Sequence, residues 1–188
     1  FLAAQDFAGV GGDVQYVRSL IEMRAYYPIA NKVTLVGRVI GGHIFGWGGD
    51  DVRLIDLYYK GGETIRGFDR SGLGPRDLTT RDALGGSTFY AATAEMRFPF
   101  PFLPDELGIS GAVFVDAGSL FGAGAGAKRL NAEGKIVLAD DASLRSSVGG
   151  SILWNSPLGP LRADFAYVIT SEKYDDKQFF RFGASTKF

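Results

Sequence analysis

The feature that most constrains the fold is an alternation of polar and apolar residues along nearly the whole chain. Between Ser87 and Phe100, for example, Thr93, Glu95 and Arg97 fall on one face, and mainly apolar residues fall on the other. Successive side chains of a β-strand point to opposite faces, so this pattern predicts strands with one polar and one apolar face. The predicted strands number about eight, of about 10–14 residues each: Phe1–Val10, Asp13–Tyr27, Lys32–Phe45, Ser87–Phe100, Gly108–Phe121, Ser143–Asn155, Pro160–Thr170 and Lys177–Phe188.

The predicted strands are long, and their connections alternate in length. Strands of soluble proteins have a mode of about 5–6 residues, whereas a strand that crosses a membrane needs about 9–11. The connections after the second, fourth and sixth strands are short, and those after the third and fifth are long. Short turns on one side and long loops on the other are typical of outer-membrane barrels. The sequence therefore predicts an all-β, antiparallel transmembrane β-barrel.

Aromatic residues near the strand ends support this interpretation, because membrane barrels carry aromatic girdles at both interfaces. The alternative is a soluble β-sandwich or lipocalin-like barrel, in which the apolar face points inward and the charges point outward. Alternation alone does not separate the two, but strand length, loop asymmetry and the paired girdles favour the membrane. The aromatics are Tyr27, Phe98, Phe100, Trp154 and Phe188 at the side of the short turns, and Phe45, Trp47 and Phe121 at the other.

Composition narrows the function classes. The chain has no cysteine, one histidine (His43) and a formal net charge of −1. It therefore lacks material for a disulfide framework, a cysteine nucleophile or a histidine-cluster metal site. No basic patch predicts binding to nucleic acid. We expect a protein that is not an enzyme and that uses neither a metal nor a cofactor.

One connection is much longer than the others. It runs from about Trp47 to Gly86, and loops longer than roughly 12–15 residues are usually functional or disordered. It contains Arg66 between Ile65 and the pair Gly67-Phe68. The residues alone leave open that Arg66 is a solvated loop charge, which would contribute only about 0–1 kcal/mol.

Three motifs in order give the chain a resemblance to a known family. They are Ile65-Arg66-Gly67-Phe68 in the long loop, Phe114-Val115-Asp116-Ala117-Gly118 on a strand, and a last strand that ends in Phe188. Together they resemble the BamA family of outer-membrane protein insertases. The resemblance covers essentially the whole chain, residues 1–188. It implies the C-terminal part of a bacterial outer-membrane barrel, with the last eight of about sixteen strands.

The resemblance also implies roles for particular residues. In that family the Arg-Gly-Phe loop folds into the barrel lumen, which makes Arg66 the donor to Glu95 and Asp116. Both acids fall on the polar faces of the next two strands, and a planar guanidinium can bridge two carboxylates. Gly67 permits a backbone geometry that a Cβ would hinder, and Phe68 can wedge the loop against the wall. Since an eight-stranded barrel is filled by its own side chains, a loop of this size implies a wider wall.

The last strand is a second candidate site. The run Arg181, Phe182, Gly183 through Phe188 resembles the β-signal of outer-membrane proteins, although Thr186 stands where a hydrophobic residue is usual. In the family this strand pairs weakly with the first strand and forms a lateral gate, at which a client strand can add to exposed backbone groups. An ordinary closing strand remains the alternative.

The function that the resemblance implies is the assembly and insertion of β-barrel proteins into the bacterial outer membrane. The implied partners are outer-membrane lipids, unfolded outer-membrane protein clients and accessory lipoproteins, the last through parts outside this chain. Two alternatives remain open. One is a two-partner-secretion-type transporter pore of the same superfamily, and the other is a passive porin or adhesin.

Overall fold

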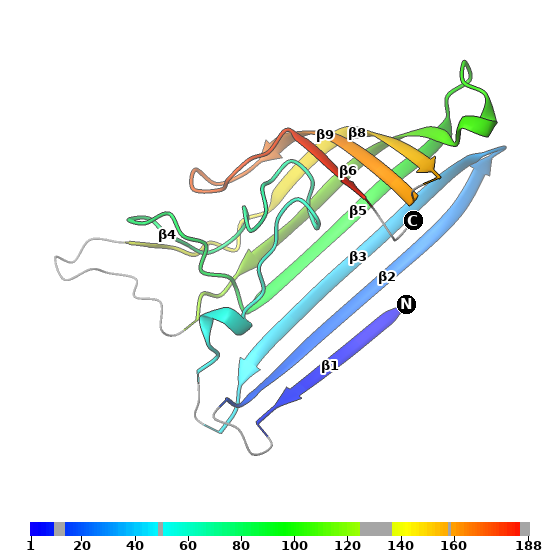
Figure 1. The fold of residues 1–188 in the computed structure, drawn as a ribbon. Coiled ribbons are helices and arrows are strands. Elements are labelled where there is room, and N and C mark those ends of the chain that lie inside the picture. The colour runs from blue at the N-terminus through cyan, green and yellow to red at the C-terminus, as the bar shows by residue number, and fades with distance from the viewer. Residues whose placement is uncertain (10–13, 49–50, 125–136, 158, 185–188) are drawn as a thin grey trace.

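A computed structural model of the chain describes residues 1–9, 14–48, 51–124, 137–157 and 159–184. Its main feature is one antiparallel sheet of eight strands, in which every strand pairs with its neighbours along the chain (Figure 1). β1 and β10 are the two edges of this sheet, so the wall is an open segment of a barrel. The strands in order are β1 (Leu2–Ala8), β2 (Tyr16–Ala30), β3 (Val33–Gly46), β5 (Thr88–Pro99), β6 (Ile109–Phe121), β8 (Arg145–Ser156), β9 (Gly159–Thr170) and β10 (Phe180–Ala184).

The predicted strands and the observed strands agree within a few residues except at the C-terminal end. The last strand was expected to begin at Lys177, whereas β10 covers only Phe180–Ala184. The difference arises because the backbone of residues 176–178 bonds to the long loop instead of to β9. Phe188, and the rest of the predicted strand beyond Ala184, lie outside the described residues.

Short elements lie within the connections. β4 (Arg76–Asp77) pairs with β7 (Leu138–Ala139), which joins the long connection after β3 to the one after β6. Two single-turn 3-10 helices, η1 (Leu54–Asp56) and η2 (Asp105–Leu107), complete the elements of the described chain. The sequence did not predict the β4–β7 pair, because two residues are too few to show an alternation.

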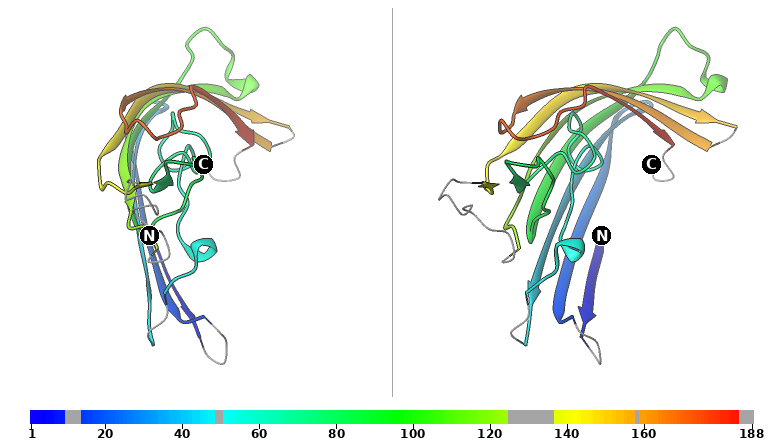
Figure 2. Two further views of the ribbon diagram at one scale, coloured as in Figure 1. Left: turned by 90° about the vertical axis from the view of Figure 1, so that its left-hand side faces the viewer. Right: turned by 60° about the vertical axis from the view of Figure 1, so that its left-hand side comes forward.

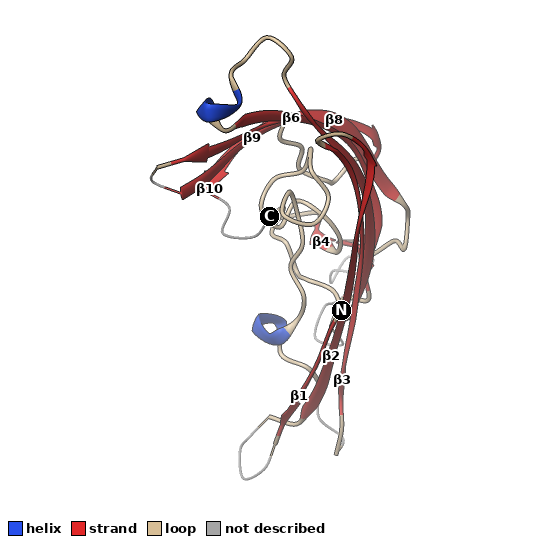
Figure 3. Ribbon diagram, turned by 90° about the vertical axis from the view of Figure 1, so that its right-hand side faces the viewer, coloured by secondary structure: helices blue, strands red, loops and turns tan. Residues whose placement is uncertain are grey.

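The sheet is strongly curved, and the long loop lies on its concave side (Figures 2 and 3). The convex face carries exposed apolar side chains, as expected of a wall that faces lipid. β2 and β3 have 15 and 14 residues, enough to cross a bilayer as tilted strands. In the part of the chain that is described, no helix is long and apolar enough to cross a membrane. Exposed apolar side chains of the convex face include Met23, Leu35, Val39, Val113, Val115, Ile152, Tyr167 and Phe182.

The hydrophobic core lies inside the curve, between the loop and the concave face. It brings loop side chains such as Ile65 and Phe68, each 1% exposed, against side chains of β3, β5 and β6. Burial of apolar surface stabilises a fold in proportion to the area removed from water. The packing of these side chains therefore holds the loop against the wall. The core residues are Ile40, Ile44, Leu57, Tyr58, Ile65, Phe68, Leu73, Phe89, Ala91 and Leu120.

Candidate functional site

Arg66 at the loop tip is bonded to two acids of the wall. Its Nε and Nη2 donate to the two carboxylate oxygens of Asp116, each at 2.7 Å, and its Nη1 donates to Oε2 of Glu95 at 2.5 Å. The backbone N–H of Arg66 also donates to Asp116, at 3.0 Å. The side chains of Arg66, Glu95 and Asp116 are only 10%, 4% and 1% exposed. The guanidinium therefore forms a bidentate pair with Asp116 of β6 and a single hydrogen bond with Glu95 of β5.

The local backbone explains how the loop presents Arg66. A tight turn precedes it, in which the N–H of Ile65 donates to the carbonyl of Gly61 at 3.0 Å. Gly67 has a φ of +93°, a conformation that side chains rarely adopt, and a Cβ there would lie 3.0 Å from Cγ2 of Val168. Phe68 then enters the core, so the three residues face a salt-bridge cluster, β9 and the apolar core in turn.

The wall supports this cluster with other residues besides the two acids. The guanidinium of Arg66 lies 3.4 Å from the centre of the Phe114 ring, a cation–π contact. Gly118 lies farther along β6, where a Cβ would come within 2.3 Å of the carbonyl oxygen of Tyr90. Thus Phe114 packs against the guanidinium of Arg66, while the lack of a side chain at Gly118 allows β6 to pack closely against β5.

Glu95 is a hub that joins three arginines. Besides the bond from Arg66, it accepts bonds from Nε of Arg97 and Nη2 of Arg162, both at 2.7 Å. Arg162 in turn donates to Asp164 from its Nε at 2.6 Å. This network ties the loop to β5, β6 and β9. The polar alternation placed Arg97 on the correct face, but did not predict its bond to Glu95.

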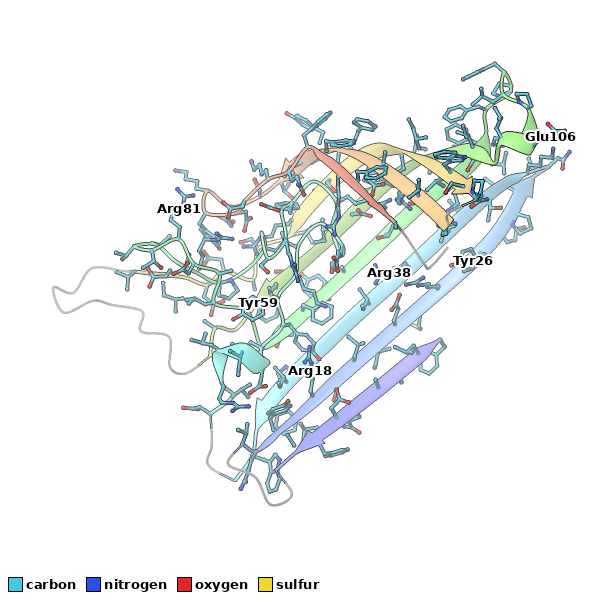
Figure 4. All side chains as sticks on the ribbon, viewed as in Figure 1. Arg18, Tyr26, Arg38, Tyr59, Arg81 and Glu106 are labelled. Atoms are coloured by element: carbon cyan, nitrogen blue, oxygen red, sulfur yellow. The ribbon has the colours of Figure 1, made fainter. Side chains whose placement is uncertain are left out.

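A further set of cations continues along the concave face. Arg38 of β3 and Arg24 of β2 both donate from Nε to Oε1 of Glu22, at 2.8 and 2.6 Å. Arg18 lies over the ring of Tyr58, with its Cζ 4.4 Å from the ring centre. Figure 4 labels Arg18 and Arg38 on their strands. The inside of the wall is thus charged and hydrogen-bonded, in contrast to the apolar outside.

A second buried ion pair anchors the segment between β9 and β10. Nε of Arg145, at the start of β8, donates to Oδ2 of Asp175 at 3.1 Å, and both side chains are 0% exposed. Nη2 of Arg145 also donates to the hydroxyl of Tyr174. Sequence reasoning missed this pair, because Asp175 sits in a short charged loop that resembles a solvated surface turn. Only the fold brings Arg145 of β8 next to Asp175, which buries both side chains.

The same segment is hydrogen-bonded to the long loop. The N–H of Asp69 donates to the carbonyl of Asp176 at 3.0 Å, and the N–H of Gln178 donates to the carbonyl of Gly67 at 2.9 Å. Nη1 of Arg76 adds a 2.6 Å bond to the Asp176 carboxylate. Residues 171–179 therefore lie between Arg145 of the wall and the tip of the long loop.

The predicted residues of the last strand have two different environments. Arg181 points to the concave side, where it pairs with Glu63 of the long loop at 2.9 Å. Phe182 is 62% exposed, and Gly183 pairs with Arg162 of β9 in the sheet. In the described part of the chain, no three or more His, Cys, Asp or Glu side chains are grouped to hold a metal ion.

The Tyr174 phenol gives the Arg145 anchor a measurable pH signature. Burial raises the pKa of Tyr174 to about 12, aided by the carboxylates of Asp141 and Asp175 and opposed by Arg145. The pKa of Tyr174 in the folded state lies above the ordinary value of about 10. The contribution of this residue to the free energy of unfolding is therefore complete below pH ~10 and is lost as the pH rises toward 12. Subtracting the ultraviolet phenolate titration of Tyr174→Phe from that of the wild type should isolate a step near pH 12. A step near pH 10 would contradict this environment.

Comparisons with known proteins agree with this architecture. The Omp85 superfamily domain matches residues 1–188. The outer membrane protein assembly factor BamA of Neorickettsia risticii is 36% identical over 183 residues, which are 97% of this chain and 23% of that protein. BamA of Nitratidesulfovibrio vulgaris is 32% identical over 170 residues, 89% of this chain and 20% of that protein. The sorting and assembly machinery component 50 homolog of Mus musculus is 30% identical over 126 residues, 64% of this chain and 26% of that protein.

A solved structure shows the same wall. The crystal structure of BamA from Haemophilus ducreyi lacking POTRA domains 1–3 superposes with a TM-score of 0.77 at 26% identity, over 92% of this chain and 35% of that one. The chain spans 20–24% of the length of the bacterial relatives it matches. The open, curved sheet is therefore a partial barrel of that architecture. With the match over all of residues 1–188, the chain belongs to the Omp85 superfamily.

Proposed function

We propose that this chain is the C-terminal part of a barrel that assembles and inserts β-barrel proteins into the bacterial outer membrane. The observation that carries the proposal is membership of the Omp85 superfamily, together with relatives that are named outer membrane protein assembly factors. The apolar convex face fits a site in the outer membrane, surrounded by its lipids. Unfolded outer-membrane proteins are the clients, and accessory lipoproteins assist through other parts of the full-length protein.

The proposed mechanism is strand addition without enzymatic chemistry. Within the described residues, β10 has 5 residues and pairs with one neighbour, β9, which has 12. A short edge strand presents unpaired backbone N–H and C=O groups, to which an extended client segment can bind. Backbone hydrogen bonds and burial of the client's apolar face in lipid supply the free energy, so no ATP is needed.

The docked loop gives this mechanism a rigid support. Through Arg66 it is attached to β5 and β6, and through Gly67 and Asp69 it is hydrogen-bonded to residues 176–178, just before β10. The cluster of Arg66, Glu95 and Asp116 thus holds the region from which the edge strand begins. We assign it a positional role, because its hydrogen bonds join the loop to β5 and β6.

Depletion of the full-length protein in its own bacterium tests the proposal. We expect the amounts of other β-barrel proteins in the outer-membrane fraction to fall as the protein is depleted, and to recover when the wild-type gene is supplied. Unchanged amounts would contradict the proposal. Normal assembly combined with loss of one exported protein would instead identify a secretion pore.

A further inference from the structure

Arg181 of β10 is paired with the loop rather than with the acid opposite it in the sheet. Its cross-strand partner on β9 is Asp164, and opposite charges at such positions normally attract each other. Oδ1 of Asp164 already accepts bonds from Nε of Arg162 at 2.6 Å and from the hydroxyl of Ser151 at 2.5 Å. Nη2 of Arg181 donates instead to Oε1 of Glu63, at 2.9 Å. The charge of the edge strand is therefore directed to the loop.

The loop backbone lies directly against this arginine. A Cβ on Gly62 would be 2.7 Å from Nη1 of Arg181 and 2.5 Å from the carbonyl oxygen of Phe68. Just before β10, the backbone hydrogen bonds of the chain switch from the loop to the wall. The N–H of Gln178 donates to the carbonyl of Gly67 in the loop, whereas the carbonyl of the next residue, Phe179, accepts from the N–H of Ala166 in β9. The start of β10 is consequently the point at which the chain passes from the loop to the wall.

The two attachments of the loop differ greatly in exposure. The side chains of the Arg66 cluster are at most 10% exposed, whereas those of Glu63 and Arg181 are 77% and 31% exposed. An exposed ion pair changes an equilibrium by no more than about fivefold, and salt screens it. The Glu63–Arg181 pair can therefore open while the Arg66 cluster stays closed.

We propose that Glu63 and Arg181 form a releasable latch that positions the start of β10 on the docked loop. When the ion pair is formed, it holds the start of β10 against the docked loop. When the ion pair is broken, β10 is free to move and to pair with a client strand, while Arg66 keeps the loop in place. Both are positioning residues, and their role in assembly rests on the function proposed above.

Hydrogen exchange of the full-length protein in lipid bilayers tests the latch directly. In Glu63→Gln, the amides of residues 180–184 should exchange about twofold to fivefold faster, while those of residues 65–68 should not change. Asp51→Asn, which removes an exposed acid of the same loop, should leave both regions unchanged. High salt should accelerate exchange of β10 in the wild type and have no further effect in Glu63→Gln.

A charge reversal separates a paired role from a general loss of stability. The double variant Glu63→Arg with Arg181→Glu should return the exchange of residues 180–184 to within about twofold of the wild-type rate. Unchanged exchange in Glu63→Gln, equal acceleration at residues 65–68, or no recovery in the double variant would each overturn the latch.

Assembly of a client β-barrel protein by the same reconstituted variants distinguishes the latch from the proposed function. A changed assembly rate in Glu63→Gln, restored by the charge reversal, supports the positioning role. An unchanged rate, in a preparation whose wild type assembles clients, overturns that role. If the wild type assembles no client, the proposed function fails, and the exchange rates still decide whether the latch exists.

Discussion

Replacing Arg66 with alanine is expected to abolish most of the assembly activity of the full-length protein. The substitution leaves the buried carboxylate of Asp116 without the cation that it pairs with, while Glu95 keeps its bonds from Arg97 and Arg162. Breaking a buried ion pair in this way costs about 3–5 kcal/mol, with the lower end applying where water enters the lumen. The loop should then undock from β5 and β6. Complementation of a depleted strain measures activity, and proteolysis within residues 51–86 measures undocking.

Two controls make the Arg66 result specific. Arg70→Ala removes an exposed arginine four residues away in the same loop and should retain normal assembly. Arg66→Lys keeps the charge but cannot form the bidentate pair with Asp116 and the bond to Glu95 at once, so it should remain clearly impaired. Full activity of Arg66→Ala at normal protein levels would show that the cluster does not support assembly.

The second large effect is expected at the anchor between Arg145 and Asp175. Asp175→Ala leaves a fully buried guanidinium without its carboxylate, which we expect to lower the free energy of unfolding by about 3–5 kcal/mol. Residues 171–179 should detach from β8 and become open to proteases. Urea unfolding of the full-length barrel, followed by tryptophan fluorescence, measures the loss.

The matched variants separate the ion pair from other effects. Lys173→Ala changes an exposed residue of the same segment and should alter the free energy of unfolding by less than about 0.5 kcal/mol. The double variant Arg145→Met with Asp175→Ala removes both charges, so it should be more stable than Asp175→Ala alone. If the double variant is instead the less stable of the two, Arg145 is not an unpaired buried charge in Asp175→Ala.

The wall was largely predictable because a half-exposed strand leaves a local signal. The alternation that put Glu95 and Asp116 on the polar face holds in the structure, where both point to the concave side. Register follows from it, since a slip by one residue would move every polar side chain into the lipid. The comparisons confirm the partial-barrel fold and the superfamily that the motifs suggested.

Contacts between loops and the wall were less accessible to sequence reasoning. Arg66 was singled out through a family motif, and the structure places it on both acids; its part in assembly stays a prediction. Asp175 and Glu63 belong to no comparable motif, and their partners lie 30 and 118 residues away in the chain. Such pairs depend on where the loops fold back, which no local pattern determines.

The most direct test of the central claim is a double-mutant cycle between Arg66 and Asp116. The rate of client assembly by the reconstituted full-length protein would be measured for Arg66→Ala, Asp116→Ala and the double variant. If the two residues act through their mutual contact, each single variant should be at least about tenfold slower than wild type, and the double variant about as slow as one single variant. A double variant whose loss is the product of the two single losses would show that they act independently, and would contradict the account.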